Sequence, residues 1–386
     1  SPRGRIYLMR ADTDGRLAMG PDVRRHLDLC LDCRACETAC PSGVRYGKLI
    51  EPFKIAMQKD APDGAGPSLL QRLILHHLFP YAGRVKAALL PARWLQKLGV
   101  LSLAERTGAL RLLPPTLRRM EAVLPRLSSG PGRLPEVLPP IGPRRARVAL
   151  FLGCVADAMY PETTAATARV LQQNGCEVVI PRGQGCCGAI HYHSGAEAPA
   201  LALARRNMKT FDPDAFDAIV VNAAGCGAMF KDYAHILTPA EHDQASRFVA
   251  KVKDVSEFLV ALGPIPPKHA VPVKATYHDA CHLCHAQQIR NQPRQLLGLI
   301  PGLELTPLEE SELCCGAAGT YNLTQPEMSE RLGRRKMDHI EATGAAVVAT
   351  GNVGCILQIA RKIKERDAAI EVVHPVELLD RAYRGA

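Results

Sequence analysis

Four cysteines near the N-terminus follow a tight spacing, with two, two and three residues between them and Pro41 directly after the last. Three thiolates at this spacing can fold around one iron–sulfur cubane and ligate one iron each, while the fourth points away and serves a second cluster. Zinc is the alternative, because CxxC pairs also bind Zn²⁺, but zinc ribbons use two separated pairs. The spacing therefore favours [4Fe-4S] ligation by Cys30, Cys33, Cys36 and Cys40.

This run requires a partner run. The first three thiolates leave one iron to be ligated from elsewhere, and Cys40 needs three companions there. The 386 residues contain no such run, and the chain opens on Ser1. We therefore expect residues 1–50 to be the second half of a ferredoxin-type domain with two [4Fe-4S] clusters, whose first half precedes Ser1 in a longer chain.

Eight further cysteines form two matching sets. Equivalent members are offset by 127 to 129 residues, and both adjacent pairs continue as Cys-Cys-Gly-Ala. Four cysteines in register predict an internal repeat of two homologous units. We expect one cluster per unit, or one shared between them; the alternative is a pair of structural thiols in a degenerated site. The sets are Cys154, Cys186, Cys187 and Cys226, and Cys281, Cys314, Cys315 and Cys355.

Other donors lie near these sets. Cys176 falls in an apolar segment and is expected in the core, whereas Cys284 is a spare ligand, a redox thiol or a bystander. Histidines also gather here, and one of them could replace a missing thiolate or move a proton to a quinone. The other interpretation is that these histidines lie around the sites, or on the surface, without binding a metal. They are His191, His193, His278, His282 and His285.

Alternating strands and helices must position the two sets. Residues 147–154, 176–181 and 216–226 are short apolar segments, and 161–175 is a helical segment that ends at a glycine. Strand–helix–strand alternation predicts an α/β layer with parallel pairing, in which strand ends present the cysteines. We expect an α/β fold, α+β overall, with Cys-Cys-Gly units at 147–270 and 271–386.

The connecting region, 51–146, is basic. Residues 51–147 hold 16 Lys and Arg against 6 Asp and Glu, which accounts for the whole net charge of +10. The stretch 68–112 predicts helices whose apolar face lies on a membrane surface or packs on its own protein. Eight prolines within 114–143 predict an irregular linker.

Composition narrows the function. The chain is 47% hydrophobic and 22% charged, as in folded proteins, and no window approaches the roughly 18 apolar residues of a membrane span. Aromatic residues make up 5%, and no nucleic-acid-binding signature is present. GxGxxG, P-loop and GxSxG motifs are also missing. The chain thus carries electron-transfer sites without a device for substrate or flavin, so we expect the electron donor on another subunit.

These segments together resemble the iron–sulfur subunit of glycolate oxidase (glycolate dehydrogenase). The resemblance rests on residues 1–9, 27–46, 222–229 and 314–322, and covers nearly the whole chain. It implies an oxidoreductase complex in which flavin-containing subunits oxidise glycolate. This chain would carry electrons through [4Fe-4S] clusters to a quinone or membrane acceptor, with no substrate chemistry of its own. It would lie in the cytoplasm, peripheral to the inner membrane, and would bind no nucleic acid.

More distant relatives with Cys-Cys-Gly units leave alternatives open. These are the Cys-Cys-Gly subunit of heterodisulfide reductase, the electron subunit of anaerobic glycerol-3-phosphate dehydrogenase, and lactate-utilisation proteins. In that pattern each unit ends in CxxC, whereas this chain has Met229 and Gln358 at the last position. The lost thiolates disfavour a disulfide reductase, and a non-redox scaffold that only docks flavin subunits is the remaining alternative.

Overall fold

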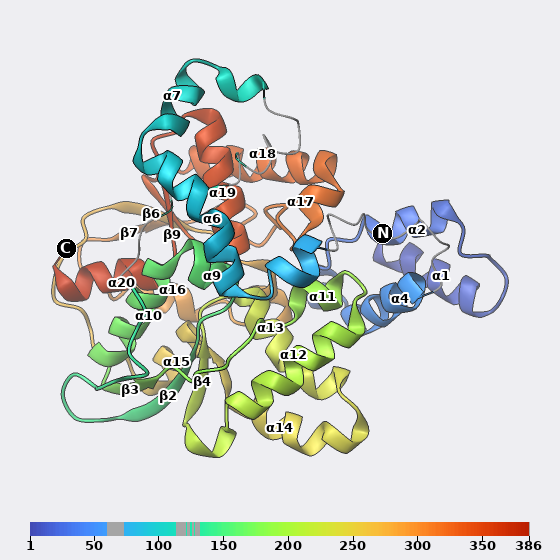
Figure 1. Ribbon diagram of the computed structural model, residues 1–386, viewed down its shortest axis with the longest axis horizontal. Coiled ribbons are helices and arrows are strands. Elements are labelled where there is room, and N and C mark those ends of the chain that lie inside the picture. The colour runs from blue at the N-terminus through green and yellow to red at the C-terminus, as the bar shows by residue number, and fades with distance from the viewer. Residues whose placement is uncertain (60–72, 113–120, 122–123, 126, 128–131, 386) are drawn as a thin grey trace.

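The computed structural model describes residues 1–59, 73–112, 121, 124–125, 127 and 132–385 (Figure 1). The first segment is helical, and Pro2 and Pro21 stand at helix starts, where a missing N–H breaks no bond. Its helices enclose a small core that includes Leu27 and Ile50. The ferredoxin-type fold of this segment stays a prediction. Its helices are α1 (Pro2–Thr13), α2 (Pro21–Asp28), α3 (Ala35–Thr38) and α4 (Gly47–Lys59), the last running across the predicted boundary at residue 50.

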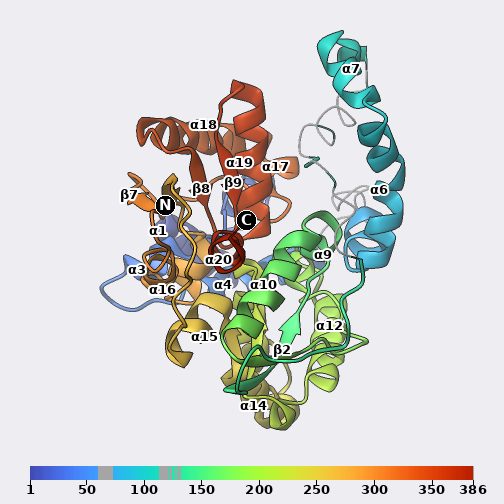
Figure 2. The ribbon, with the colours of Figure 1, turned by 90° about the vertical axis from the view of Figure 1, so that its left-hand side faces the viewer.

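The connecting region forms a helical arm that stands away from the sheets (Figure 2). The arm consists of η1 (Leu73–Leu78), α6 (Ala82–Lys97), α7 (Val100–Arg106) and η2 (Ala109–Leu112). The predicted helices are confirmed over 73–112, while 68–72 and part of the proline-rich stretch lie outside the described residues. Within that stretch the short strand β1 (Val137–Leu138) joins the edge of the first sheet, which the prolines did not predict.

The first unit surrounds a sheet with the strand order β1-β3-β2-β4-β5. All pairs are parallel except the one made by β1, as the alternation of strands and helices predicted. Its elements are β2 (Ala146–Phe151), α9 (Val155–Met159), α10 (Pro161–Gln173), β3 (Cys176–Val179), α11 (Ala189–His193), α12 (Glu197–Thr210), η3 (Pro213–Ala215), β4 (Ala218–Val221), α13 (Ala224–Ile236), η4 (Pro239–Glu241), α14 (His242–Lys251), β5 (Val252–Asp254) and α15 (Val255–Leu262).

The second unit has an all-parallel sheet with the order β7-β6-β8-β9. Its elements are β6 (Lys274–Tyr277), η5 (His282–Ala286), α16 (Gln292–Leu297), β7 (Glu304–Thr306), α17 (Tyr321–Thr324), α18 (Pro326–Ala342), β8 (Val347–Ala349), α19 (Val353–Arg366), β9 (Glu371–Val373) and α20 (Pro375–Arg384).

The two sheets repeat one topology, which confirms the predicted internal repeat. Strand order β3-β2-β4-β5 corresponds to β7-β6-β8-β9. The register agrees too, since Ala149 pairs with Ile219 in the first unit and the equivalent Thr276 pairs with Val348 in the second. Helix α10 packs against α20, and α15 packs against α16. These contacts are equivalent under exchange of the units, as an internal pseudo-two-fold requires.

The core lies where these helices cover the sheets. Strand β4 is buried at all four residues, because a parallel strand is covered on both faces. One apolar cluster runs through both units and joins β2 and β4 to β6 and β8, so the repeats share a continuous interior. Among the described helices, none combines the length and apolar character needed to cross a lipid bilayer.

Candidate metal centres

The turn after α2 brings three thiols of the N-terminal run together. Burial, followed by the nearby thiol of Cys281, raises the pKa of Cys33 to about 11. Burial, Cys33 and Cys30 together raise the pKa of Cys36 to about 11. Thiols that resist ionisation in this way become ligands when a metal cation reverses the local electrostatics. Cys33 and Cys36 thus lie within electrostatic range of neighbouring thiols, and the binding of iron by Cys30, Cys33 and Cys36 stays a prediction.

Cys40 belongs to a different environment. The backbone N–H groups of Val44, Ser42 and Gly43 bond to its sulfur and lower its pKa. The pKa of Cys40 is therefore set chiefly by its own turn, whereas burial first, and then neighbouring thiols, raise those of Cys33 and Cys36. N–H groups aimed at a sulfur also tune iron–sulfur clusters. The geometry fits the expectation that Cys40 serves a separate cluster.

In the first unit four thiols meet at the carboxyl ends of parallel strands. Cys154 follows β2, the pair Cys186-Cys187 follows β3, and Cys226 opens α13 after β4. The Sγ atoms of Cys154 and Cys186 are 3.5 Å apart, far beyond a disulfide bond of about 2.05 Å. Cys187 bonds to Cys186 and Cys226. The donation from Cys154 lowers the pKa of Cys186 and raises that of Cys154 itself.

The second unit repeats this arrangement and adds a buried amine. Cys281 bonds to Cys314, and Cys315 bonds to Cys314 and Cys355. All 14 cysteines of the chain are free thiols. Lys336 is 1% exposed, and burial lowers its pKa while the thiols oppose that shift. The amine thus places a cation beside three of these thiols, those of Cys314, Cys315 and Cys355.

The backbone conformation explains why a glycine follows each pair of cysteines. Gly188 and Gly316 have φ values of +90° and +89°, where a side chain is strained. Their N–H groups approach the first cysteine of each pair, with N–Sγ distances of 3.4 Å to Cys186 and to Cys314. A Cβ on Gly316 would lie 2.7 Å from the Ser329 carbonyl oxygen. The motif thus folds its cysteine loop tightly around the sulfur atoms.

The N-terminal run docks against the second unit. Cys281 affects the pKa of Cys33, and Cys33 affects that of Cys314, so the two thiol groups are electrostatic neighbours. The Thr38 hydroxyl lies 3.0 Å from Nδ1 of His285 across the same junction. The sequence did not predict this proximity, because it depends on tertiary packing between segments about 250 residues apart.

An ion cluster joins the same run to the first unit. The Arg34 guanidinium lies 3.0 Å from Asp32, 3.3 Å from Glu37 and 2.7 Å from Glu51. Nδ1 of His193 lies 2.7 Å from Glu51 and 3.3 Å from Asp32. His193 therefore faces carboxylates, not thiols. This cluster was not predicted from the sequence, although the charged residues inside the cysteine run indicate that charges lie close to the thiols.

The remaining predicted donors divide between core and site. Cys176 is fully buried in β3, and burial raises its pKa to about 12, which confirms its core position. The Cys284 thiol donates to the Cys281 carbonyl over 3.8 Å. His282 Nδ1 lies 3.6 Å from the Cys281 sulfur, and buried His191 lies near the thiols of the first unit.

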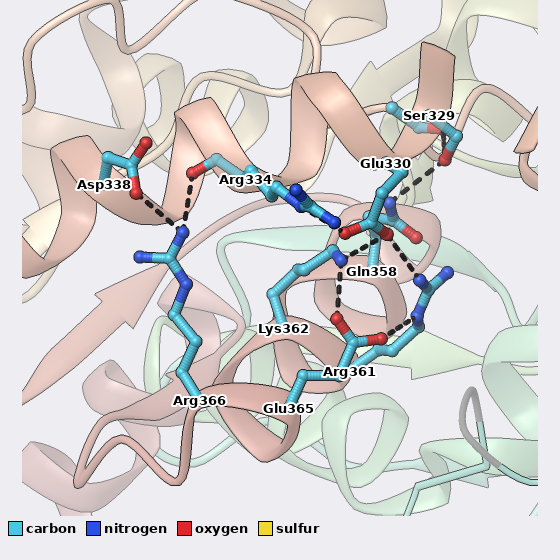
Figure 3. A network of polar contacts seen from close by, with 10 residues as sticks. Ser329, Glu330, Arg334, Asp338, Gln358, Arg361, Lys362, Glu365 and Arg366 are labelled. Carbon is cyan, nitrogen blue, oxygen red and sulfur yellow. Dashed lines mark hydrogen bonds and ion pairs between the residues drawn. The ribbon is translucent and has the colours of Figure 1, made fainter. Parts of the chain in front are cut away.

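Met229 and Gln358 stand where the related pattern has a fifth cysteine in each unit, and each makes contacts of another kind. Met229 is 2% exposed in the apolar core of the first unit. Gln358 donates to the Ser329 hydroxyl over 3.2 Å, and that hydroxyl donates to the Gly316 carbonyl over 2.8 Å. This bond belongs to a polar network between α18 and α19, in which Lys362 joins Glu330 (Figure 3). Gln358 thus supports the cysteine loop of the second unit through Ser329, and neither residue supplies a thiolate.

Comparisons with known proteins agree with this architecture. A cysteine-rich domain model matches residues 148–231 and 275–360, and a model described as "Glycolate oxidase iron-sulfur subunit, linker region" matches 66–124. The Escherichia coli (strain K12) glycolate oxidase iron-sulfur subunit is 32% identical over 99% of this chain and 88% of its own length. The chain belongs to the glycolate oxidase iron–sulfur subunit family. A family member from Bacillus subtilis (strain 168), named "Probable glycolate oxidase iron-sulfur subunit", is 41% identical over 98% of this chain and 87% of its own length.

Other matches are more limited. Lactate utilization protein A of Halalkalibacterium halodurans is 34% identical over 62% of this chain and 98% of its own length. Among solved structures, an aspartate racemase homologue from Pyrococcus horikoshii OT3 covers 62% of this chain and 98% of that one, with 14% identity and a TM-score of 0.23. A TM-score this low carries no argument about function.

Proposed function

We propose that this chain is the electron-transfer subunit of a glycolate dehydrogenase complex. Bound iron–sulfur clusters would accept electrons one at a time from a flavin-containing subunit and release them towards a quinone. The observation that supports this most directly is the gathering of eleven cysteines in three groups, of three, four and four, with Cys33 of the run beside Cys281 of the second unit. Thiols placed at separate but adjoining sites suit a relay better than a single catalytic centre.

Each group has a defined set of ligands in this proposal. Cys30, Cys33 and Cys36 hold three irons of one [4Fe-4S] cluster, and Cys40 contributes to another. The two Cys-Cys-Gly units hold one cluster each, through the four thiols that meet at their strand ends. Buried, mutually bonded free thiols fit this donor set, because iron accepts several thiolates that would otherwise repel one another.

The substrate class follows from the relatives and not from a pocket on this chain. The near-full-length relatives are named for glycolate oxidase, whereas lactate utilization protein A matches 62% of the chain. We therefore place glycolate first and lactate second, with oxidation on the flavin subunit in both cases. Dye reduction by the purified complex with glycolate, D-lactate and glycerol 3-phosphate in parallel distinguishes them.

The proposed complex lies on the cytoplasmic face of the membrane. The basic arm supports membrane contact, because its exposed apolar side chains lie among arginines and lysines. Trp94 is 60% exposed and Leu98 is 69% exposed. Lys97 stands near the Trp94 ring, with its Nζ 5.8 Å from the ring centroid.

The substitution Cys33→Ser tests the relay in the assembled complex. We expect glycolate-dependent dye reduction to fall roughly 100-fold, with loss of iron, because a ligand of the first cluster is removed. Cys176→Ser is the matched control, since Cys176 is buried but belongs to no thiol group among the described residues. Unchanged dye reduction in Cys33→Ser, or zinc in place of iron in the unaltered protein, would disprove the relay.

A further inference from the structure

His278 occupies a special place at the end of β6. Its side chain is fully buried. Its ring and the sulfurs of Cys315 and Cys355 form a group whose ligand atoms all lie within 4.8 Å of one another. Cys315 and Cys355 are two of the four thiols of the second unit, so the imidazole adds a fifth donor to that site.

The hydrogen bonding of the ring leaves one nitrogen available. Nδ1 lies 2.9 Å from the Ser311 carbonyl oxygen, which only accepts, so Nδ1 carries the proton. Nε2 then presents its lone pair, and this buried atom has no hydrogen-bond partner among the described residues. A metal-ligating histidine characteristically donates its other N–H to a backbone carbonyl in this way.

The first unit, which the structure describes throughout, has a different residue at this position. Phe151 holds the matching place at the end of β2, as the shared strand register shows. It is 1% exposed and packs on Phe230, with ring centroids 4.6 Å apart. At this strand position the repeated fold therefore places a phenyl ring in the first unit and an imidazole nitrogen in the second.

We propose that Nε2 of His278 is an iron ligand of the second Cys-Cys-Gly unit. The imidazole takes the place of the thiolate that Gln358 no longer supplies, and the centre of the first unit is ligated by thiolates alone. Coordination releases no proton from the ring, because Nδ1 keeps its proton on Ser311. The assignment rests on the proposed function, which places iron among these thiols.

Nitrogen coupling in the assembled complex tests the assignment. The complex is prepared with ¹⁴N- and ¹⁵N-histidine, reduced, and measured by electron spin echo envelope modulation together with iron analysis. We expect a strong histidine-nitrogen coupling that disappears in His278→Cys, while the iron content stays constant. Because a thiolate adds negative charge to the centre, His278→Cys should also shift its reduction equilibrium about tenfold, which lowers its potential by about 59 mV.

Further variants separate ligation from folding and from the proposed function. His278→Phe reproduces the residue of the first unit and should abolish the coupling even if His278→Cys folds poorly. His339→Phe, on α18 of the same unit, should retain it. Coupling that persists in both His278 variants, or is missing from an iron-replete unaltered complex, overturns the assignment and leaves the relay intact. A complex without iron overturns both.

Discussion

Lys336 places a cation next to one thiol group only. Its Nζ donates to the carbonyls of Glu310 and Ser311 at 2.5 and 3.3 Å, which fixes the amine in the interior. In the first unit the equivalent residue is Asn207, whose amide donates to the Cys186 carbonyl over 2.9 Å. A nearby positive charge stabilises the reduced form of a cluster, so this single difference should separate the potentials of the two centres.

The substitution Lys336→Gln removes the charge and keeps a hydrogen-bond donor. We expect the second-unit centre to become about tenfold harder to reduce, a fall of about 59 mV in a redox titration followed by visible absorption. Lys364→Gln, on the outer side of α19, is the control. An unchanged potential in Lys336→Gln would contradict an electrostatic role for this amine.

At the scale of elements, the ion cluster fastens α3 and α4 to α11. Asp32 and Arg34 adopt left-handed conformations, with φ values of 53° and 60°, which turn both side chains into the cluster. Strain of this kind persists only where surrounding contacts hold it. The junction therefore depends on the charges of Arg34 and His193 staying between the carboxylates.

The charge of His193 makes this junction sensitive to alkaline pH. Burial alone would lower the pKa of His193, but its bonds to Asp32 and Glu51 outweigh burial and raise it to about 10. A pKa raised in the folded state gives stability that is complete below the unfolded value of about 6.5 and is lost as pH rises through about 10. We expect the free energy of unfolding, measured with urea, to decline across that interval.

His193→Gln should remove that decline. At pH 7 the variant should lose about 3 kcal/mol of stability, because two buried carboxylates lose one of their cations while Arg34 remains. His242→Gln, at an exposed position on α14, is the control and should leave the pH profile intact. An unaltered slope between pH 6.5 and 10 in His193→Gln would show that another group governs it.

The repeat and the thiol groups could be predicted from the sequence because both depend on short sequence patterns that can be recognised without tertiary contacts. Cys154 and Cys281 fall directly after apolar strand segments, and parallel strands bring such positions to one edge. The place of Cys33 beside Cys281 could not be predicted, since it depends on docking between distant segments. The roles of Arg34 and Lys336 could not be predicted for a similar reason. Their charges act strongly only where burial has removed the surrounding water.

At the scale of the whole molecule, the arm of α6 and α7 should direct the complex to anionic lipid. The double substitution Trp94→Ser with Leu98→Ser should weaken co-sedimentation of the complex with phosphatidylglycerol vesicles, because it removes two of the most exposed apolar side chains of the arm. Added salt should weaken binding of the unaltered complex, since the arm is also basic. Leu323→Ser, exposed on α17, is the control. Retained binding in the double variant would assign membrane contact to another surface or subunit.

The N-terminal run contacts the two units through different groups, carboxylates at His193 of the first and a hydroxyl and a thiol at His285 and Cys281 of the second, and this asymmetry has a consequence for how the repeats diverge. A duplicated module begins as two interchangeable copies, and any junction formed with one copy ends that equivalence. From then on, substitutions in the other copy no longer disturb the junction, and each copy diverges under separate selection. We therefore expect lineages that keep the contrast of His278 with Phe151 to keep that of Lys336 with Asn207.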